Sequence, residues 1–489
     1  MSEQILKGLK PEILWKRFYE ISRVPRASKK EGKVIEHFKK LFAELNVTYK
    51  QDKVGNLLAS VPATKGYEKT PVVVLQGHVD MVCEKNKDKL HDFDNDPIIL
   101  KRADGWITAD GTTLGSDNGI GVAAALAVIS DKEFVHGPIE ILLTVDEETG
   151  LTGANNLEQG FMSGKILLNL DSEEDGAFYV GCSGGIDTEG KFKIDFENVN
   201  SDFISYDIFV TGLKGGHSGL DINTGRANAI KILARILKEL NRFDYKISSI
   251  TGGSKRNAIP REAEATIFVQ LENVNEIEKV IADLKSKFNN EFKVSDSGLK
   301  LEFNKKTVAA KKVFSDAFKE RIINSILAIP HGVIAMSQDI PDLVETSTNL
   351  ATMTMDNDHL VIGTCQRSSI ESAKNYIAQC VESVFHLANA NVANEDAYPG
   401  WKPNLDSVIL KISKEVFKDL FNKEPEIKAV HAGLECGILG DKEPFLDMIS
   451  FGPTIIGAHS PDEKVNIETV EKFYELLKGI LTYIAEKKI

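Results

Sequence analysis

The sequence predicts an α/β protein: a split domain with a central, mostly parallel sheet and helices on both faces, interrupted by an inserted α+β domain. Three observations lead to this fold class. Apolar runs alternate with helix-like segments in the first third of the chain, as strands linked by helices do. After about residue 184, strand patterns alternate apolar and polar residues, which is typical of half-exposed antiparallel strands. Near residue 400 the first pattern returns.

The first third of the chain supplies four expected strands and one long helix. The segment Val72–Val79 is nearly all apolar, as expected of a strand that is covered on both faces of a sheet. The expected strands are Val54–Val61, Val72–Val79, Ile139–Val145 and Ile166–Leu170, and the expected helix runs from about Ile120 to Ser130. This alternation favours a layered α/β arrangement.

The middle of the chain has a different pattern. The segments SYDIFVTGL and EATIFVQLE are typical of half-exposed strands, and amphipathic helices are interleaved with them. The expected elements are helices at about Arg226–Leu240, Ile277–Phe288, Lys312–Ala328 and Ser369–Ala388, and strands near Ser347–Met355 and His359–Thr364. Their order suggests a degenerate repeat, which one sequence does not establish.

A segment rich in Asn, Pro and Gly, NANVANEDAYPGWKP, indicates a boundary. After it we expect a helix at about Leu405–Phe421, strands near Ile427–His431 and Met448–Phe451, and a closing helix at about Ile467–Glu486. We therefore divide the chain into a first part of the split domain (1–184), an inserted domain (185–399) and a second part of the split domain (400–489).

Length and composition limit the class of protein. A chain of 489 residues is long for one core, which favours two domains. A formal charge of −13 argues against nucleic acid or anionic lipid as the main partner. No stretch approaches the roughly 20 apolar residues that cross a bilayer, and the start lacks the apolar core of a signal peptide. Five scattered cysteines without CxxC pairs fit a reducing compartment, so we expect a cytoplasmic protein.

His78 and Asp80 lie two residues apart at the carboxyl end of an expected strand, so their side chains leave the strand on the same face. Sites form at that end of the strands in open α/β sheets. A metal-binding imidazole and the carboxylate that orients it would use this spacing. A His and an Asp that are merely solvated in a loop are an equally good interpretation of the pair alone.

Further acids and a second histidine occupy comparable places. Asp117 precedes a helix in TLGSDNGIG, where an N-cap is the more common role for an isolated Asp. The other candidates follow expected strands or lie in a Gly- and Pro-rich loop: Asp146, Glu147 and Glu148 in TVDEETG, Asp171 in NLDSEED, and His459 in IIGAHSPDE. Crowding like charges beside an apolar strand is costly unless a cation opposes them.

Together these positions predict a divalent metal site. Core packing does not require a His or an acid after nearly every strand, whereas a metal ion needs carboxylates and imidazoles that converge from several elements. Two histidines, several carboxylates and no clustered cysteines make zinc the leading metal. Mn²⁺ or Co²⁺ could substitute for it.

The motifs QGHVDMV, LGSDNGIG, TVDEETG, NLDSEE and IGAHSPDE resemble the motif series of the di-zinc exopeptidase, aminoacylase and carboxypeptidase family. Within that family the chain is most similar to the aminoacyl-histidine dipeptidase branch, also called Xaa-His or cytosol non-specific dipeptidases. The resemblance runs from about Leu9 to the C-terminus and includes DKVGNLLA, HSGLDI, SKRNAIPR and HAGLECG. It implies that the split domain is catalytic and that the inserted domain is a lid and dimerisation domain.

The resemblance also implies the metal ligands. Two Zn²⁺ per subunit would be bound, one by His78 and Asp171 and the other by Glu148 and His459, with Asp117 bridging the two ions.

The remaining residues of the split domain have supporting or catalytic roles in the resemblance. Asp80 would support His78. Glu147 would be the general base, taking a proton from a zinc-activated water and passing it to the leaving amine. The resemblance implies a cis peptide bond between Asp117 and Asn118. We expect Asp146 to be structural.

The inserted domain and the segment after it carry further candidates. The resemblance implies that His217 in GGHSG reaches the active site of a neighbouring subunit and stabilises the oxyanion, although unaided we would favour a polar loop residue. Arg367 in GTCQRSS offers a bidentate contact to a terminal carboxylate, and a surface salt bridge is the alternative. Asn257 in SKRNAIP would be a companion contact. Gly433 and Glu435 in HAGLECG would line the pocket near the amino end of the substrate.

The implied function is hydrolysis of unblocked dipeptides, Xaa-His such as β-alanyl-histidine among them, by a homodimer joined through the lid domain. Small peptides are the expected substrates, and neither nucleic acid nor a membrane is an expected partner. A related aminoacylase or carboxypeptidase is the alternative, which the length of the insertion argues against. A non-catalytic peptide-binding homologue is a weaker alternative, because such a protein would be expected to lose a ligand or the base.

Overall fold

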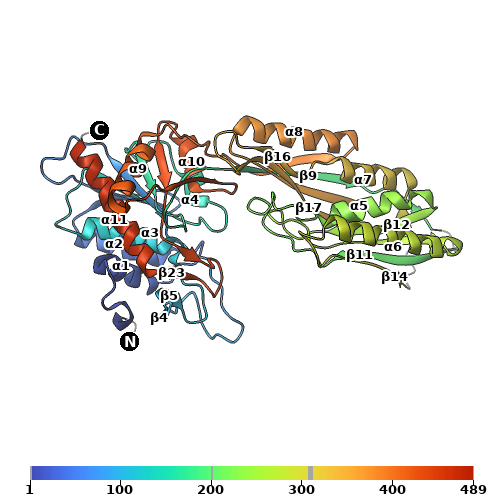
Figure 1. Cartoon of the computed structure of the whole chain (residues 1–489), viewed down its shortest axis with the longest axis horizontal. Helices are drawn as coiled ribbons and strands as arrows, with labels where there is room; N and C mark the ends of the chain where they lie inside the picture. The colour runs from blue at the N-terminus through green and yellow to red at the C-terminus, as the bar shows by residue number, and fades with distance from the viewer. Residues whose placement is uncertain (1–2, 200–201, 307–311, 488–489) are drawn as a thin grey trace. The chain divides into compact units, whose positions relative to one another are not determined.

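The computed structural model describes residues 3–199, 202–306 and 312–487 (Figure 1). The chain forms two compact units. Unit 1 comprises Met1–Gly181, Pro403–Ala429 and Leu434–Ile489, and unit 2 comprises Cys182–Lys402 and Val430–Gly433. The α/β fold class is confirmed, with the sheet and element corrections given below. The predicted division into 1–184, 185–399 and 400–489, and the roles given to those parts, stay predictions.

Unit 1 alternates strands and helices. Its elements, in chain order, are α1 (Glu12–Ser22), α2 (Gly32–Glu44), β1 (Thr48–Gln51), β2 (Leu57–Val61), β3 (Val73–His78), β4 (Leu100–Ala103), β5 (Trp106–Ala109), α3 (Ser116–Ser130), β6 (Ile139–Thr144), α4 (Thr152–Asn156), β7 (Ile166–Asn169), β8 (Ala177–Cys182), α9 (Val408–Phe421), β20 (Glu426–Val430), α10 (Glu435–Lys442), β21 (Asp447–Ser450), β22 (Ile455–Ile456), β23 (Lys464–Asn466) and α11 (Ile467–Lys487).

The central sheet of unit 1 is mixed rather than mostly parallel. Its strand order is β1-β2-β6-β3-β7-β21-β8-β20. The four central strands β6, β3, β7 and β21 pair in parallel. β2 pairs antiparallel with β1 and with β6, and β8 pairs antiparallel with β21. The short turn of residues 52–56 between β1 and β2 can join only antiparallel neighbours, which the apolar pattern of the strands does not reveal.

The parallel strands determine where a site can form. All six residues of β3 and all six of β6 are buried, so both faces of the sheet are covered there. The apolar helix α3 packs on β3 and also against α1 and α11 (Figure 1). Because β3, β6 and β7 run in parallel, their carboxyl ends meet at one edge of the sheet.

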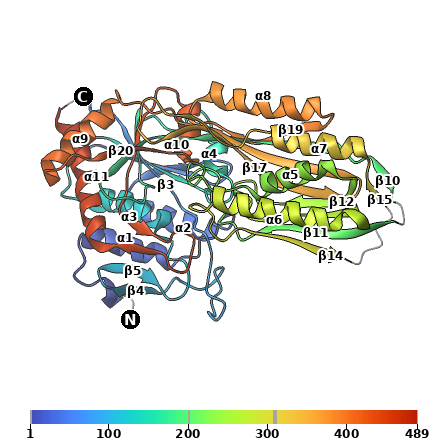
Figure 2. The same ribbon diagram turned by 45° about the vertical axis from the view of Figure 1, so that its right-hand side comes forward.

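Unit 2 is built on a long antiparallel sheet. Its elements are β9 (Gly184–Lys193), β10 (Phe196–Asn198), β11 (Phe203–Thr211), α5 (Ala229–Glu239), β12 (Tyr245–Gly252), β13 (Ala263–Gln270), α6 (Val274–Glu291), β14 (Lys300–Lys306), β15 (Lys312–Phe314), α7 (Asp316–Ala328), β16 (Gly332–Met336), β17 (Val344–Asp356), β18 (His359–Ser368), α8 (Glu371–Leu387) and β19 (Asn391–Tyr398). The strand order is β14-β11-β13-β12-β17-β18-β9-β19, with β16 paired to β17. Figure 2 shows α5 to α8 along one face of this sheet, where one apolar core joins helices and strands.

One segment that was predicted to be a domain boundary is partly a strand. β19 pairs antiparallel with β9 from Asn391 to Tyr398. Most of its side chains are exposed, since β19 is an edge strand. Backbone hydrogen bonding to a neighbour holds such a strand without any apolar pattern, so the polar sequence NVANEDAY gave no indication of it.

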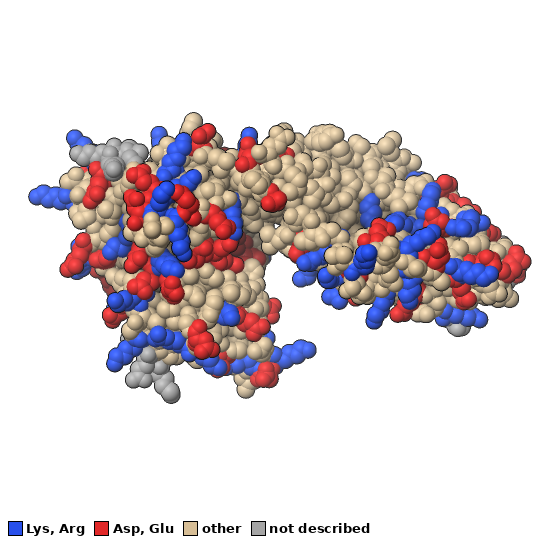
Figure 3. All heavy atoms as spheres, viewed as in Figure 1, with Lys and Arg blue, Asp and Glu red and all other residues tan. Residues whose placement is uncertain are grey.

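The surface of unit 2 varies along its helices. In Figure 3, Lys and Arg side chains mix with Asp and Glu over α5 and α6, whereas α8 shows few charged side chains. Two large residues of α8, Tyr376 and Leu387, are 64% and 86% exposed. In the part of the chain that the structure describes, no helix has the length and apolar character to span a bilayer.

Candidate metal centre

Five candidate ligands come together at the carboxyl edge of the unit 1 sheet. His78 is the last residue of β3, Glu148 follows β6, and Asp171 follows β7. Asp117 lies in the first turn of α3, and His459 lies in the loop between β22 and β23. Segments far apart in the sequence therefore supply one cluster of imidazoles and carboxylates.

The five side chains form two triads that share one residue. Nε2 of His78 lies 3.0 Å from Oδ1 of Asp117 and 3.3 Å from Oδ1 of Asp171. Nε2 of His459 lies 3.1 Å from Oδ2 of Asp117 and 3.0 Å from Oε2 of Glu148. The potential ligand atoms of each triad lie within 4.8 Å of one another. Asp117 presents a different oxygen to each triad, which suits two cations that share a carboxylate.

The chemistry of both triads fits a divalent metal ion. Each offers one imidazole nitrogen and two carboxylate groups, ligands that zinc accepts. Oε1 of Glu148 is buried without a hydrogen-bond partner. The N-cap of α3 is Gly115, so Asp117 does not fill the capping role that the sequence alone favoured. The peptide bond between Asp117 and Asn118 is cis, as expected.

The carboxylates of the cluster perturb one another. Burial, with the nearby Asp117 carboxylate adding to it, raises the pKa of Asp171 to about 7. Burial and the charges of Asp117 and Asp171 raise the pKa of Glu173 to about 8. Hydrogen bonds to Asp117 and Glu148 raise the pKa of His459 to about 11. Protons therefore partly balance the negative charge that a cation would neutralise.

Asp80 holds the turn that follows β6. Its Oδ1 lies 3.4 Å from Nδ1 of His78. Its two oxygens accept hydrogen bonds from the backbone N–H groups of Glu147 (3.1 Å) and Glu148 (3.2 Å). Burial alone would raise the pKa of Asp80, but its contacts with His78 and with the Glu147 amide lower it to about 2. Asp80 is therefore a charged group that fixes both His78 and the acidic turn.

The other two acids of this turn differ from each other. Glu147 is half-buried and lies within 4.8 Å of ligand atoms of His78 and Glu148. Burial raises the pKa of Glu147 well above its usual value, and the charges of neighbouring carboxylates add to this effect. Asp146 instead accepts hydrogen bonds from the hydroxyls of Thr149 and Thr152, both at 2.5 Å, and it closes the turn.

His217 lies in unit 2, on the loop between β11 and α5. Its Nδ1 accepts hydrogen bonds from the backbone N–H groups of Gly219 and Leu220, both at 3.1 Å. Because Nδ1 is an acceptor, the neutral ring carries its proton on Nε2. Burial and the charge of Arg367 lower the pKa of His217 to about 4. The ring is therefore neutral at pH 7 and can donate a hydrogen bond from Nε2.

Arg367 is joined to the same loop of unit 2. It is 6% exposed, and its Nε donates to Oγ of Ser218 at 3.3 Å. Its Nη1 donates to Oη of Tyr398 at 2.7 Å. The carbonyl oxygen of Asn257 accepts from the backbone N–H of Ser218 at 2.9 Å. Ser218 and Tyr398 could not be predicted from the sequence, since nothing in it indicates that they meet the guanidinium.

Gly433 and Glu435 lie in different units. Gly433 faces Tyr398, because a Cβ at this position would come within 3.0 Å of the Tyr398 ring. Glu435 begins α10 in unit 1 and is 1% exposed. Its Oε2 accepts hydrogen bonds from Gln76 (2.6 Å) and Thr144 (2.7 Å). This oxygen thus contacts the ends of β3 and β6, whereas Oε1 of Glu435 is buried without a hydrogen-bond partner. The role of Glu435 as a substrate contact stays a prediction.

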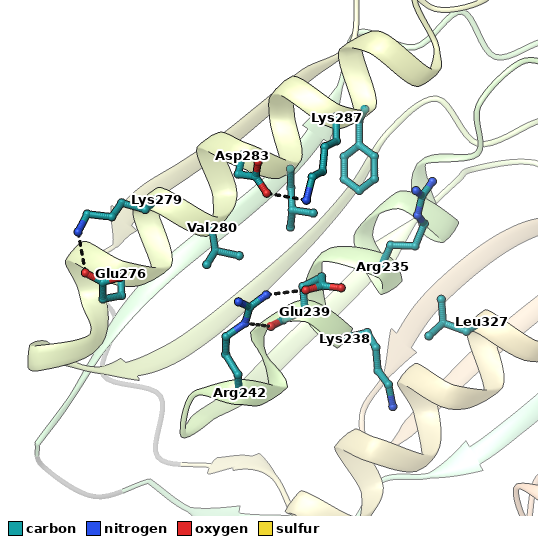
Figure 4. A pocket seen from close by; sticks show the side chains of 12 residues that line it. Arg235, Lys238, Glu239, Arg242, Glu276, Lys279, Val280, Asp283, Lys287 and Leu327 are labelled. Carbon is teal, nitrogen blue, oxygen red and sulfur yellow. Dashed lines mark hydrogen bonds and ion pairs between the residues drawn. The ribbon is translucent and has the colours of Figure 1, made fainter.

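Described residues of unit 2 form a cavity and a groove on its surface. A cavity of about 900 Å³ is lined by His217 and Asn257. A groove of about 510 Å³ between α5, α6 and α7 contains none of the candidate site residues (Figure 4). Most of its charges are paired on their own segment: Arg242 with Glu239 at 2.5 Å, Lys279 with Glu276 at 2.7 Å, and Lys287 with Asp283 at 2.8 Å. We assign this groove no function.

The chain has relatives over its whole length. Residues 74–483 match the model of Peptidase family M20/M25/M40. The chain is 41% identical over 489 residues to the cytosol non-specific dipeptidase of Escherichia coli (strain K12), with 100% of both chains covered. The crystal structure of aminoacylhistidine dipeptidase from Vibrio alginolyticus is similar, with a TM-score of 0.90 and 41% identity over 99% of each chain. Aminopeptidase PepT from Bacillus cereus ATCC 10987 has a TM-score of 0.58 at 18% identity over 98% of this chain and 99% of its own, a likeness of fold alone.

We predict that metal binding by the purified chain releases protons and weakens as the pH falls. In the metal-free chain, Asp171 has a pKa of about 7 and His459 a pKa of about 11, so a cation must displace protons from both. The apparent affinity for Zn²⁺ should therefore decline from about pH 8 to about pH 6, as Asp171 becomes protonated. Calorimetric titration in buffers of different ionisation enthalpy measures the released protons. Equal affinity at both pH values, with no proton release, would contradict this expectation.

Proposed function

The chain belongs to Peptidase family M20/M25/M40, and from this membership we propose that it is a di-zinc dipeptidase. It is a metal-dependent hydrolase that acts on peptide bonds. Its proposed substrates are unblocked dipeptides, Xaa-His such as β-alanyl-histidine among them. Support comes from two relatives that align over nearly the whole chain, one named a non-specific dipeptidase and the other an aminoacylhistidine dipeptidase.

The observation that carries the proposal is the pair of triads that share Asp117. One Zn²⁺ would be held by His78 and Asp171, the other by Glu148 and His459, and both by Asp117. When bound, such a metal pair lowers the pKa of water and polarises a peptide carbonyl. Mn²⁺ or Co²⁺ could take the place of zinc, since the nitrogen and oxygen ligands suit these ions too.

Glu147 is the general base in the proposed mechanism. Its carboxylate accepts a proton from the attacking water and then gives this proton to the nitrogen of the leaving amine, which restores the carboxylate. Asp80 is a positioning residue, because it holds the backbone N–H of Glu147 and faces Nδ1 of His78.

The unit 2 residues bind the substrate in this proposal. His217 donates a hydrogen bond from Nε2 to the carbonyl oxygen as negative charge develops on it. Arg367 binds the terminal carboxylate with its guanidinium, and Asn257 adds a neighbouring contact. Gly433 leaves room beside Tyr398. A fixed carboxylate site at one residue's distance from the scissile bond favours dipeptides over longer peptides.

We place these roles in a homodimer that is joined through the lid domain, with His217 acting on the neighbouring subunit. Unit 2 carries exposed apolar residues that fit such an interface. Val333, Ile334 and Met336 on β16 are 37%, 43% and 45% exposed. β16 pairs with β17 alone among the described strands, so it is also a free edge. The proposed location is the cytoplasm, since the Escherichia coli relative is named a cytosol enzyme.

Hydrolysis of a substrate panel tests the proposed function. The purified chain should hydrolyse free dipeptides faster than tripeptides and should leave N-acetyl amino acids intact. A chelator should abolish the activity, and added Zn²⁺ should restore it, because the proposed mechanism needs the metal pair to activate water. Preference for N-acetyl amino acids would indicate an aminoacylase, and turnover of long peptides from the carboxyl end would indicate a carboxypeptidase. Binding of dipeptides without any turnover would indicate a non-catalytic homologue.

The Glu147→Gln variant distinguishes the role of general base from that of metal ligand. The amide cannot accept the proton, so kcat should fall by about 10²–10⁴-fold while two metal ions remain bound. Steady-state kinetics and metal analysis of the same preparation measure both quantities. Glu158→Gln is the matched control, since Glu158 is an exposed acid of unit 1 paired only with Lys53. Near-normal turnover by Glu147→Gln would disprove the assignment.

Arg367→Met tests carboxylate recognition. Wild-type chain should hydrolyse dipeptides more efficiently than the corresponding dipeptide amides, because only the former carry a terminal carboxylate. The variant should lose about 10–100-fold in kcat/KM on dipeptides and little on the amides, which corresponds to one charge-assisted hydrogen-bonded contact. Arg235→Met, which removes an exposed arginine of unit 2 paired with Glu291, should change neither value. An unchanged ratio of dipeptide to amide in Arg367→Met would rule out this role.

A further inference from the structure

Glu463 is buried beside the metal triads, although the proposed mechanism gives it no role. It is 1% exposed and lies on the His459 loop, just before β23. Its Oε2 accepts hydrogen bonds from the backbone N–H groups of Leu114 (2.7 Å) and Gly115 (2.9 Å). Its Oε1 accepts from the backbone N–H of Ser116 (2.7 Å) and from the Ser116 hydroxyl (2.6 Å).

A further weak contact extends this set to the shared ligand. The backbone N–H of Asp117 lies 3.3 Å from Oε1 of Glu463. One carboxylate therefore binds four consecutive amides at the start of α3. Capping of this helix by a distant glutamate leaves both oxygens of Asp117 free to face His78 and His459.

Arg26 binds carbonyl oxygens of this loop and of the segment that follows His78. It is 3% exposed, and its Nη1 donates to the carbonyl oxygens of Val79 (2.9 Å) and Asp80 (2.7 Å). Its Nη2 donates to the carbonyl oxygen of Gly115. The guanidinium thus joins the segment after His78 to the loop that carries Asp117. Burial lowers the pKa of Arg26, and the nearby charge of Glu463 opposes this effect.

Arg26 and Glu463 together connect three ligand-bearing segments. Arg26 links the segment of His78 to the loop of Asp117, and Glu463 links that loop to the loop of His459. Apart from the bond from the Ser116 hydroxyl, these links run to backbone groups, so they mainly fix the path of the chain rather than the rotation of one side chain. Both residues are buried. Glu463 directs its hydrogen bonds at the loop of Asp117, and Arg26 divides its hydrogen bonds between that loop and the segment after His78.

We propose that Arg26 and Glu463 are positioning residues that hold Asp117 between the two metal sites and thereby raise the affinity of the chain for its metal pair. This inference rests on the proposed function. Residues that hold metal ligands in place commonly contribute about 10–100-fold to metal affinity. The site formed by Asp117, Glu148 and His459 should depend most on Glu463. Glu463 lies on the loop that carries His459, and it binds the loop that carries Asp117.

The test is Zn²⁺ binding to the full-length, chelator-stripped chain, measured by calorimetric titration. Glu463→Gln should lower the affinity of at least one of the two sites by about 10–100-fold, since an amide nitrogen would face backbone N–H groups. Arg26→Lys should lower it as well, because a lysine lacks the fork that reaches three carbonyl oxygens. Ser116→Ala removes only one hydrogen bond to Glu463, so it should cause a smaller loss and should fold even if the other two variants do not.

Glu140→Gln is the matched control. Glu140 is a buried glutamate of β6 that accepts hydrogen bonds from the backbone N–H groups of Ser163 and Gly164 and from the Ser163 hydroxyl. It lies at the start of β6, whereas the candidate ligands lie at the strand ends. This variant should lower the thermal unfolding temperature yet keep the wild-type Zn²⁺ affinity.

The outcomes distinguish this inference from the proposed function. Wild-type Zn²⁺ affinity in Glu463→Gln, Arg26→Lys and Ser116→Ala would overturn the inference and leave the dipeptidase proposal intact. An equal loss of affinity in Glu140→Gln would also overturn it, because the effect would then be a general loss of structure. A wild-type chain that binds no divalent metal would overturn the proposed function, and the inference with it.

Discussion

One electrostatic constraint matters most in unit 1: several largely shielded carboxylates lie close together at the carboxyl edge of its sheet. Asp117 lies within hydrogen-bonding distance of both His78 and His459, and Asp171 and Glu148 lie beyond the two imidazoles. Like charges this close cannot all ionise in a buried site unless cations oppose them. In the metal-free chain, raised pKa values reduce the conflict, whereas a pair of divalent cations would remove it.

Charged side chains around the triads form hydrogen bonds to the backbone of the segments that carry the candidate ligands. Asp80 accepts hydrogen bonds from the backbone N–H groups of Glu147 and Glu148. Glu463 accepts hydrogen bonds from the backbone N–H groups at the start of α3. Arg26 supplies the complementary donors to carbonyl oxygens. A carboxylate that binds consecutive backbone N–H groups restricts the movement of that segment. A candidate ligand on the segment therefore stays close to one position. In the proposal made above, these links position the candidate ligands.

Unit 2 contributes the opposite chemistry. Its candidate residues donate hydrogen bonds: a neutral imidazole oriented by two amides in His217, and a guanidinium held by Ser218 and Tyr398 in Arg367. A peptide hydrolase needs acids and metal ions to activate water, and it needs donors to bind the carbonyl and carboxylate oxygens of its substrate. In the proposed mechanism, the residues for these two requirements lie in different units of the chain.

The sequence by itself determined the features that depend on near neighbours in the chain. The spacing of His78 and Asp80, the acids after β6 and β7, and the apolar strands that precede them are local patterns. They predict the α/β class, which is confirmed, and they indicate candidate ligands that the structure brings together, whose role in binding metal stays a prediction. The tertiary structure alone decided the antiparallel strands that flank the sheet, the polar edge strand β19 and the burial of Glu435. It also decided that Asp117 is free of its expected capping role, because the residue that takes this role, Glu463, is 346 positions away. No local pattern contains a partner at that separation; only the folded chain brings it within reach.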